Sequence, residues 1–204
     1  MEQTLQSIHI LTLLSTLIDK QVETLVLSKG ENKQTEEMLF FNARSLIILY
    51  TCSFLSEWED FLVKRSEEKH KQSIITGKKT AKPAIDRIKG WTDLKKYRNT
   101  VLAHNFRDKS NNSEPIFPMD SIECLIVPKH ISEFLLLRML VLTAVKIISN
   151  PFLNELSTDK MEFFKYIEPQ FKEIDEDKEM EVISIKINKI INETNCNDHL
   201  PIAI

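Results

Sequence analysis

The chain has 204 residues, which is enough for one domain with a sizeable core, and 42% of them are hydrophobic, which excludes general disorder. Only three glycines are present, and because tight turns between strands depend on glycine, this scarcity favours long helices over a sheet. The net charge of −3 argues by itself against a protein that binds nucleic acid through its overall charge.

Two long helices are predicted in the N-terminal third. Apolar residues recur at helical spacing from Leu5 to Leu25, and Gly30 provides a stop. After a polar link, Thr35 supplies the cap of a second helix. Its apolar positions continue for about 35 residues if the helix reaches Lys69.

The middle of the chain is predicted to alternate between loops and shorter helices. A basic loop is expected from Ser73 to Lys82, and a short helix from Pro83 to Lys89, because proline suits the first turn of a helix. Residues 109–120, rich in Asn, Ser and Pro, are predicted as a loop. Between them, a further helix is expected with one stripe formed by Trp91, Leu94, Tyr97, Val101 and His104.

The C-terminal part is predicted to hold one apolar helix and a helical extension. The apolar helix runs from about His130 to Ser149, where Asn150-Pro151 ends it. Its apolar run is interrupted by two basic residues and is shorter than the roughly 20 residues needed to cross a bilayer, so we expect a buried helix and no membrane association. Residues 158–167 are also expected to be helical, and so are residues 182–191, although these partly alternate at the strand period.

These elements predict an all-α fold. We expect a helical bundle over residues 1–150, with two long N-terminal helices, a helix at residues 91–104 and the apolar helix. Residues 151–204 are expected to form a helical extension packed on the same domain. Cys52 and Cys124 lie in apolar runs and are predicted to be core residues. The three cysteines have no disulfide or zinc spacing, which indicates a reducing, cytoplasmic location.

The run from Tyr97 to Asp108 carries the residues best suited to chemistry. Arg98 and His104 are six residues apart, and each is followed by an asparagine. Arginine matches phosphate oxygens with a fixed fork of donors, and histidine transfers protons near neutral pH. Residues 64–109 hold 14 Lys and Arg against 5 Asp and Glu. This surplus suits a polyanion, although a solvated basic face would have the same composition.

Helical geometry separates the two residues. On an ideal α-helix, positions six apart point about 120° from each other, so Arg98 flanks the apolar stripe that His104 continues. A histidine on such a stripe is more often a core residue than a catalyst. His104 gains a catalytic interpretation if the end of the stripe meets the same helix of a second chain, because two histidines and two arginines then converge at a two-fold axis.

Such a pair of chains would hold what ribonucleotide cleavage requires. One histidine takes the proton from the 2′-hydroxyl, the other protonates the leaving oxygen, and the arginines stabilise the charge of the transition state. The predicted reaction is a metal-independent transesterification that leaves a 2′,3′-cyclic phosphate.

At these residues the chain resembles the HEPN superfamily (higher eukaryotes and prokaryotes nucleotide-binding). The signature of that family is an arginine followed by a polar residue, then a histidine after four to six residues; Arg98-Asn99 and His104 match it with five residues between. The wider run is similar to HEPN-like proteins of bacterial abortive-infection and toxin-antitoxin loci. Members paired with a nucleotidyltransferase antitoxin carry a tyrosine two residues after the histidine, where this chain has Phe106.

The resemblance implies a HEPN-like bundle, a homodimer and RNA cleavage by Arg98 and His104. Asn99 would orient the phosphate or the arginine, and Asn105 and Arg107 are further candidates for phosphate binding. The predicted function is therefore a dimeric endoribonuclease, as a toxin or phage-defence effector with a cognate antitoxin. The alternative is a non-catalytic helical module that binds a nucleotide, RNA or a protein through the same surface. A local ion pair with Asp108 is the competing interpretation of Arg107.

Other candidate residues support no second site. Glu57 and Asp60 lie one turn apart and would be able to orient Arg98 or His104, although a solvated face is the more usual role of such a pair. The remaining histidines share no ligand spacing with one another or with the cysteines, so neither a metal nor another cofactor is predicted.

Overall fold

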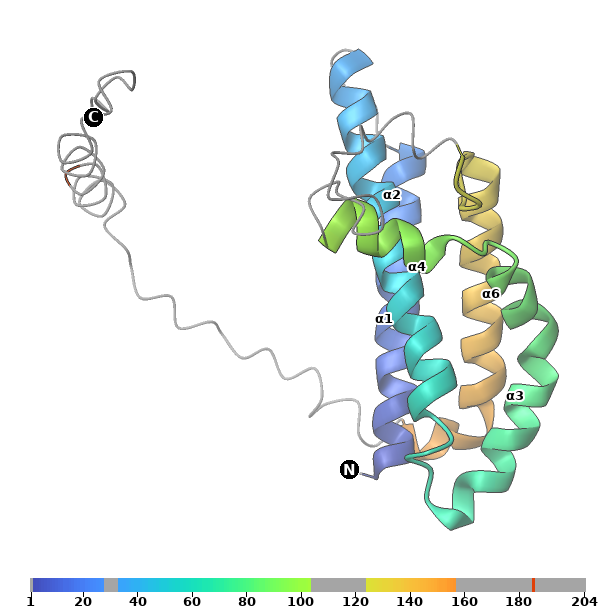
Figure 1. Cartoon of the computed structure of the whole chain (residues 1–204). Helices are drawn as coiled ribbons and strands as arrows, with labels where there is room; N and C mark the ends of the chain where they lie inside the picture. The colour runs from blue at the N-terminus through green and yellow to red at the C-terminus, as the bar shows by residue number, and fades with distance from the viewer. Residues whose placement is uncertain (1, 28–32, 104–123, 157–184, 186–204) are drawn as a thin grey trace. The chain divides into compact units, whose positions relative to one another are not determined.

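The computed structural model describes residues 2–27, 33–103, 124–156 and 185, with side chains omitted at 101–103. Every regular element within these ranges is helical, which confirms the predicted all-α class (Figure 1). The chain divides into two compact units, residues 1–163 and 164–204, and the description below concerns the first. The division at residue 150, with an extension packed on the bundle, stays a prediction.

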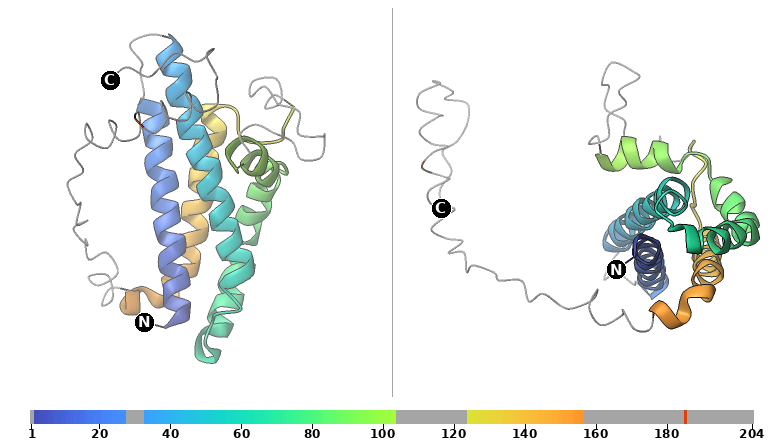
Figure 2. Two further views of the ribbon diagram at one scale, coloured as in Figure 1. Left: turned by 60° about the vertical axis from the view of Figure 1, so that its left-hand side comes forward. Right: turned by 90° about the horizontal axis from the view of Figure 1, so that it is seen from below.

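Four long helices form the bundle: α1 (Gln3–Leu27), α2 (Lys33–Ser56), α3 (Glu68–Lys89) and α6 (Ile131–Ser149). Helix α1 packs against α2 and α6, and α3 packs against α6. Neighbouring helices run in opposite directions, as Figures 1 and 2 show. The residues at the centre are fully buried and apolar, and the largest of them include Ile8, Leu11, Ile47, Phe54, Ile74, Phe134 and Leu137.

The start of α1 is held by a carboxylate from another element. Glu67 accepts hydrogen bonds from the backbone N–H of Gln3 (2.7 Å) and of Thr4 (3.2 Å), and from the Thr4 hydroxyl. Burial raises the pKa of Glu67, but these hydrogen bonds outweigh it and lower the pKa to about 2. A carboxylate at this position satisfies donors that the first turn of a helix leaves unpaired.

The second helix is shorter than the sequence predicted. Helix α2 ends at Ser56 and passes into a π-helical turn, η1 (Glu57–Phe61), in which Leu62 N–H donates to Glu57 O. Glu67 is extended, with φ −61° and ψ 150°, and α3 begins after it. The extended backbone allows Glu67 to reach the start of α1, so a tertiary contact accompanies a break that the local apolar pattern did not indicate.

Helix α3 is continuous, and the predicted loop at 73–82 followed by a short helix is wrong. Gly77 is buried inside the helix, where a Cβ atom would lie 2.6 Å from Ile148 Cδ1, so glycine here permits close packing against α6. Pro83 is also inside the helix. Because Pro83 has no N–H, the carbonyl of Lys79 lacks its usual helical hydrogen bond. Both residues are exposed, so a water molecule is able to donate to that carbonyl instead.

The apolar helix was predicted correctly. Helix α6 begins after His130 and ends at Ser149, and η3 (Asn150–Phe152) continues the chain as a 3₁₀ turn. In the segment before α6, Leu125 and Val127 are buried, whereas Cys124 is exposed, so the prediction that Cys124 is a core residue is wrong. Cys52 is buried, as predicted.

One helical stretch, Lys33–Phe61, is long and apolar enough to cross a membrane by length and composition. Half of its most apolar window is buried inside the bundle, as is usual for the core helix of a helical bundle. The absence of membrane association stays a prediction. The loop and helices predicted at 109–120, 158–167 and 182–191 lie outside the described residues, apart from the single helical residue Ile185.

Candidate nucleic-acid interface

A short helix and a π-helical turn carry the described part of the motif. They are α4 (Leu94–Tyr97) and η2 (Arg98–Ala103), and they pack across α2; Figure 1 shows α4 crossing the bundle axis. Asp93 fixes the start of α4, because its N–H donates to Ile126 O (3.1 Å) and its carboxylate accepts from Ile126 N–H (2.7 Å).

The apolar stripe of this segment is confirmed for its first three members. Trp91, Leu94 and Tyr97 are all buried, as the three-residue spacing requires. Tyr97 is 0% exposed, and its hydroxyl lies 3.2 Å from Ser45 Oγ on α2. Burial raises the pKa of Tyr97, although the Ser45 hydrogen bond and the charge of Arg44 oppose the shift. Tyr97 therefore anchors the motif to α2.

Arg98 and Asn99 form a local pair. Arg98 Nε and Nη2 both donate to Asn99 Oδ1, at 3.1 and 3.0 Å. Asn99 is exposed and Arg98 is partly buried. The amide thereby restricts the long arginine side chain, which reduces the conformational entropy that Arg98 would lose on binding a phosphate.

The backbone of the motif is not an ideal α-helix. Residues Arg98–Ala103 are π-helical, with hydrogen bonds from i to i+5. The predicted angle of about 120° between Arg98 and His104 assumed α-helical winding throughout, and His104 lies outside the described residues, so the angle stays a prediction. Short π-helical turns inside helices occur frequently at functional sites.

The surface around Arg98 is basic and lacks acidic partners within the described residues. Lys95 and Lys96 are exposed, and neither they nor Arg98 lies within 4.0 Å of a described carboxylate. By contrast, two basic residues of α3, Lys82 and Lys89, are paired with acids. We define the basic turn as Lys95, Lys96, Arg98 and Asn99.

The positive charge of the basic turn reaches α2. Burial raises the pKa of the Cys52 thiol, and the charges of Arg98 and Lys95 act against that shift. The packing of α4 and η2 on α2 accounts for the influence of these charges on Cys52.

The other predicted site residues have different positions. His104, Asn105 and Arg107 lie outside the described residues. Glu57 is buried with a charged partner in Arg65, whose Nη1 is 3.9 Å away, so the structure does not pair it with Arg98. Asp60 is exposed on η1, as a solvated face predicts, but that prediction is wrong for Glu57, which is buried.

Arg44 is a candidate functional residue that the sequence analysis missed. It is 8% exposed on α2, and its guanidinium carbon lies 5.4 Å from the centre of the Tyr97 ring. Burial lowers the pKa of Arg44, against the opposing influence of Tyr97 and Glu133. A signal was available, because Arg44 shares the helix face of Ile48 and Cys52 at four-residue spacing, and a charged residue on an apolar face is unusual.

A second cluster of polar residues lies at the foot of the bundle. Ligand atoms of Glu2, Glu67 and His70 lie within 4.8 Å of one another, which is close enough to hold a metal ion. These groups already have protein partners: Glu67 binds the start of α1, and Glu2 contacts Lys69 and His70 Nε2, the latter at 2.7 Å. The cluster therefore joins the start of α1 to the start of α3 through hydrogen bonds and ion pairs.

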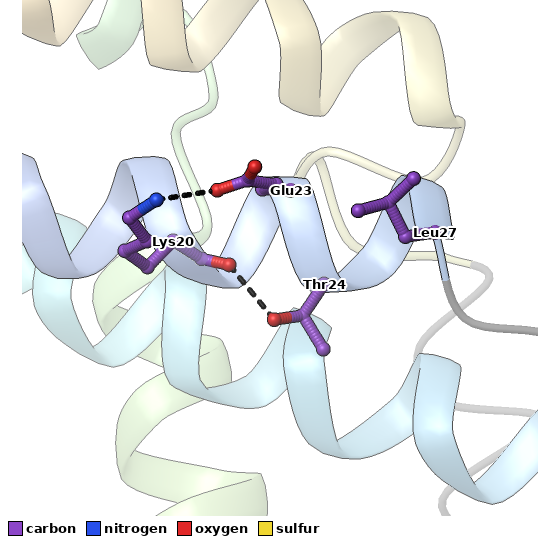
Figure 3. A pocket seen from close by; sticks show the side chains of 4 residues that line it. All are labelled: Lys20, Glu23, Thr24 and Leu27. Carbon is purple, nitrogen blue, oxygen red and sulfur yellow. Dashed lines mark hydrogen bonds and ion pairs between the residues drawn. The ribbon is translucent and has the colours of Figure 1, made fainter.

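A surface hollow on α1 has no comparable chemistry. It is lined by Lys20, Glu23, Thr24 and Leu27, all on the last turns of one helix (Figure 3). Lys20 Nζ and Glu23 Oε2 are paired at 2.7 Å, and the Thr24 hydroxyl donates to Lys20 O. These groups satisfy one another, so the hollow does not present converging polar groups to a ligand.

Comparison with known proteins identifies no relative: no family model, no curated protein and no solved structure matches this chain.

Proposed function

We propose that the chain is a metal-independent endoribonuclease of the HEPN type that acts as a homodimer. Arg98 binds the scissile phosphate, and His104 transfers protons. Asn99, Asn105 and Arg107 support the phosphate, and the products carry 2′,3′-cyclic phosphate ends. In this proposal the protein is a toxin or phage-defence effector, which a cognate antitoxin restrains.

The observation that carries the proposal is that Arg98 is held in place on a basic surface. Its guanidinium is held by Asn99 on a π-helical turn, among lysines that lack acidic partners within the described part of the chain. A positive surface attracts the phosphate backbone of RNA, and a restrained arginine fork suits a pentavalent phosphorus better than a mobile one. The helical bundle is compatible with this family, and the match of Arg98-Asn99 and His104 to its signature supplies the chemistry.

A second candidate is an RNA-binding module that does not cleave. The basic turn favours it, because binding to phosphates needs only the cations that the described residues supply. The two candidates differ only in whether His104 transfers a proton.

The test is a cleavage assay on single-stranded RNA in EDTA, with the wild type, Arg98→Ala and His104→Ala. We expect cleavage by the wild type and at least a 100-fold loss in each variant, because general acid–base catalysis contributes about 10²–10⁴-fold. Product ends are identified as cyclic phosphates by their resistance to a phosphatase until acid treatment.

The matched control is Lys79→Ala, which removes an exposed cation from α3 and is expected to cleave like the wild type. Equal cleavage in all variants would reject the proposed site. If the wild type and all the variants bind RNA but none of them cleaves it, the second candidate is favoured.

A further inference from the structure

Arg44 is a buried cation that lacks a counter-ion among the described residues. Its Nε and Nη2 are inaccessible to solvent and have no hydrogen-bond partner there, and no described carboxylate lies within 4.0 Å of its guanidinium. The contact it makes is with the face of the Tyr97 ring. A buried guanidinium is strongly unfavourable unless an anion accepts its hydrogen bonds, so this residue points to an anionic ligand.

The nearby acid cannot fill that role in its observed position. The charge of Glu133 acts on Arg44, but Glu133 Oε2 accepts from the N–H groups of Lys129 (2.8 Å) and His130 (3.0 Å). Its other oxygen accepts from Trp91 Nε1 at 3.4 Å. Glu133 thus caps α6, and Arg44 Nε and Nη2 have no acceptor among the described residues.

The surroundings of Arg44 favour a phosphate over other anions. Arg44 lies on α2 against the ring of Tyr97 on α4, and the planar fork of a guanidinium matches the oxygens of a phosphate. Arg98 directly follows Tyr97, whose ring lies against Arg44, so the two arginines lie close to the same anchored residue.

We infer that Arg44 binds a phosphate group beneath Tyr97, and that this phosphate belongs to the same RNA strand that Arg98 contacts. The inference rests on the proposed function for the identity of the strand, but the phosphate site itself rests on Arg44. The arginine fork donates two parallel hydrogen bonds to the phosphate oxygens. Because Arg44 is only 8% exposed, the phosphate that it binds is largely shielded from solvent.

The first experiment uses the full chain and inorganic phosphate, with sodium chloride at matched ionic strength as the reference. We expect phosphate to raise the midpoint of thermal unfolding of the wild type in a saturable way. Arg44→Gln should bind phosphate at least ten-fold more weakly, and Arg44→Lys, which retains charge without the fork, should be intermediate. Lys79→Gln, on the exposed face of α3, should respond like the wild type.

A second measurement needs only the wild type, so it tests phosphate binding even if the Arg44 variants do not fold. In a nitrogen-15 spectrum, the Arg44 Nε–H signal should shift on titration with phosphate and remain still with chloride. A phosphate-independent signal would overturn the inference.

The second experiment uses a DNA oligonucleotide, which lacks the 2′-hydroxyl and cannot be cleaved by transesterification. Arg44→Gln should bind it at least ten-fold more weakly than the wild type. The slope of log affinity against log salt should also decrease by about one, because one phosphate contact is lost.

The outcomes separate this inference from the proposed function. If Arg44→Gln is destabilised without phosphate and its responses to phosphate and oligonucleotide equal those of the wild type, a carboxylate of the chain itself pairs with Arg44. The inference is then wrong, whereas cleavage that depends on His104 would leave the proposed function standing. Conversely, phosphate and oligonucleotide responses that depend on Arg44, without any cleavage, would support the inference and reject catalysis.

Discussion

Single residues set the geometry of the basic turn. Asn99 holds Arg98 through two hydrogen bonds to one amide oxygen, and Tyr97, the residue before Arg98, is tied to Ser45. The arginine therefore projects from an anchored position, and the amide restrains its guanidinium. Arg44 on α2 also holds Tyr97 in place, through the contact of its guanidinium with the Tyr97 ring.

Asn99→Ala should weaken the binding of RNA by about 1 kcal/mol, or roughly five-fold, because the Arg98 guanidinium loses its restraint. Asn99→Asp should weaken it further, because a carboxylate repels the phosphate. Affinity for an uncleavable oligonucleotide at fixed salt measures both effects. Thr92→Ala, an exposed change just before α4, is the control, and equal affinity in Asn99→Ala would show that the restraint has no role.

Glu67 should make folding depend on pH in the acid range. Its pKa is depressed to about 2, so its stabilisation is fully present above the ordinary pKa of about 4.5 and is lost as the pH falls toward 2. Glu67→Gln should cost about 1 kcal/mol of unfolding free energy at pH 6, as is usual for a lost helix cap. The difference from the wild type should shrink between pH 4.5 and 2. Urea unfolding at several pH values measures it, and a constant difference would contradict this role.

At the scale of elements, α3 shows how packing overrides local signals. Gly77 and Pro83 are typical of breaks, yet the helix continues through both. Its buried positions include Ile74, Gly77 and Ala81, which follow helical spacing only when glycine and alanine are counted as core residues. Gly77 has no side chain, and this allows Ile148 of α6 to pack closely against α3.

The contact between α3 and α6 predicts a strong coupling between Gly77 and Ile148. The Cβ of Gly77→Ala would meet Ile148 Cδ1 at 2.6 Å, and Ile148→Val removes that methyl group. Ile148→Val alone should cost about 1 kcal/mol, but in the Gly77→Ala background its cost should vanish, because the added methyl fills the space. A double-mutant cycle in urea measures the coupling, and additive effects would contradict the observed contact.

At the scale of the whole molecule, the proposed site depends on a second chain. One chain offers one motif histidine, whereas cleavage needs an acid and a base. A two-fold axis near the basic turn would supply the second histidine and bring the positive surfaces together. RNA would then offset the repulsion between them.

Mixing wild-type chains with His104→Ala chains should lower the activity by more than the share of wild-type chain that is replaced. A dimer of one wild-type and one His104→Ala chain retains one of the two histidines in the shared cleft, so it lacks either the acid or the base. The two proteins are unfolded together, refolded and assayed for RNA cleavage, with each protein treated alike by itself as a control. Light scattering should give twice the chain mass. Cleavage by a monomeric wild type would reject the composite site.

The sequence alone was sufficient for the all-α class, for α1 and α6, and for the stripe of Trp91, Leu94 and Tyr97. These features depend on periodic apolar residues and on caps, which act within one or two turns. The pairing of Arg98 with Asn99 is likewise local, between adjacent residues. The resemblance to the HEPN family also rests on the sequence alone.

Tertiary structure decided the features that depend on contacts between distant residues. Glu67 caps the start of α1 from more than sixty residues away. Gly77 is a helix residue because Ile148 packs on it, and residues Arg98–Ala103 are π-helical where the apolar pattern predicted a regular α-helix. Arg44 stands out for the same reason. Its sequence neighbours show an unusual charge on an apolar face, but only the packing of α4 over α2 leaves that charge buried and without an acceptor among the described residues.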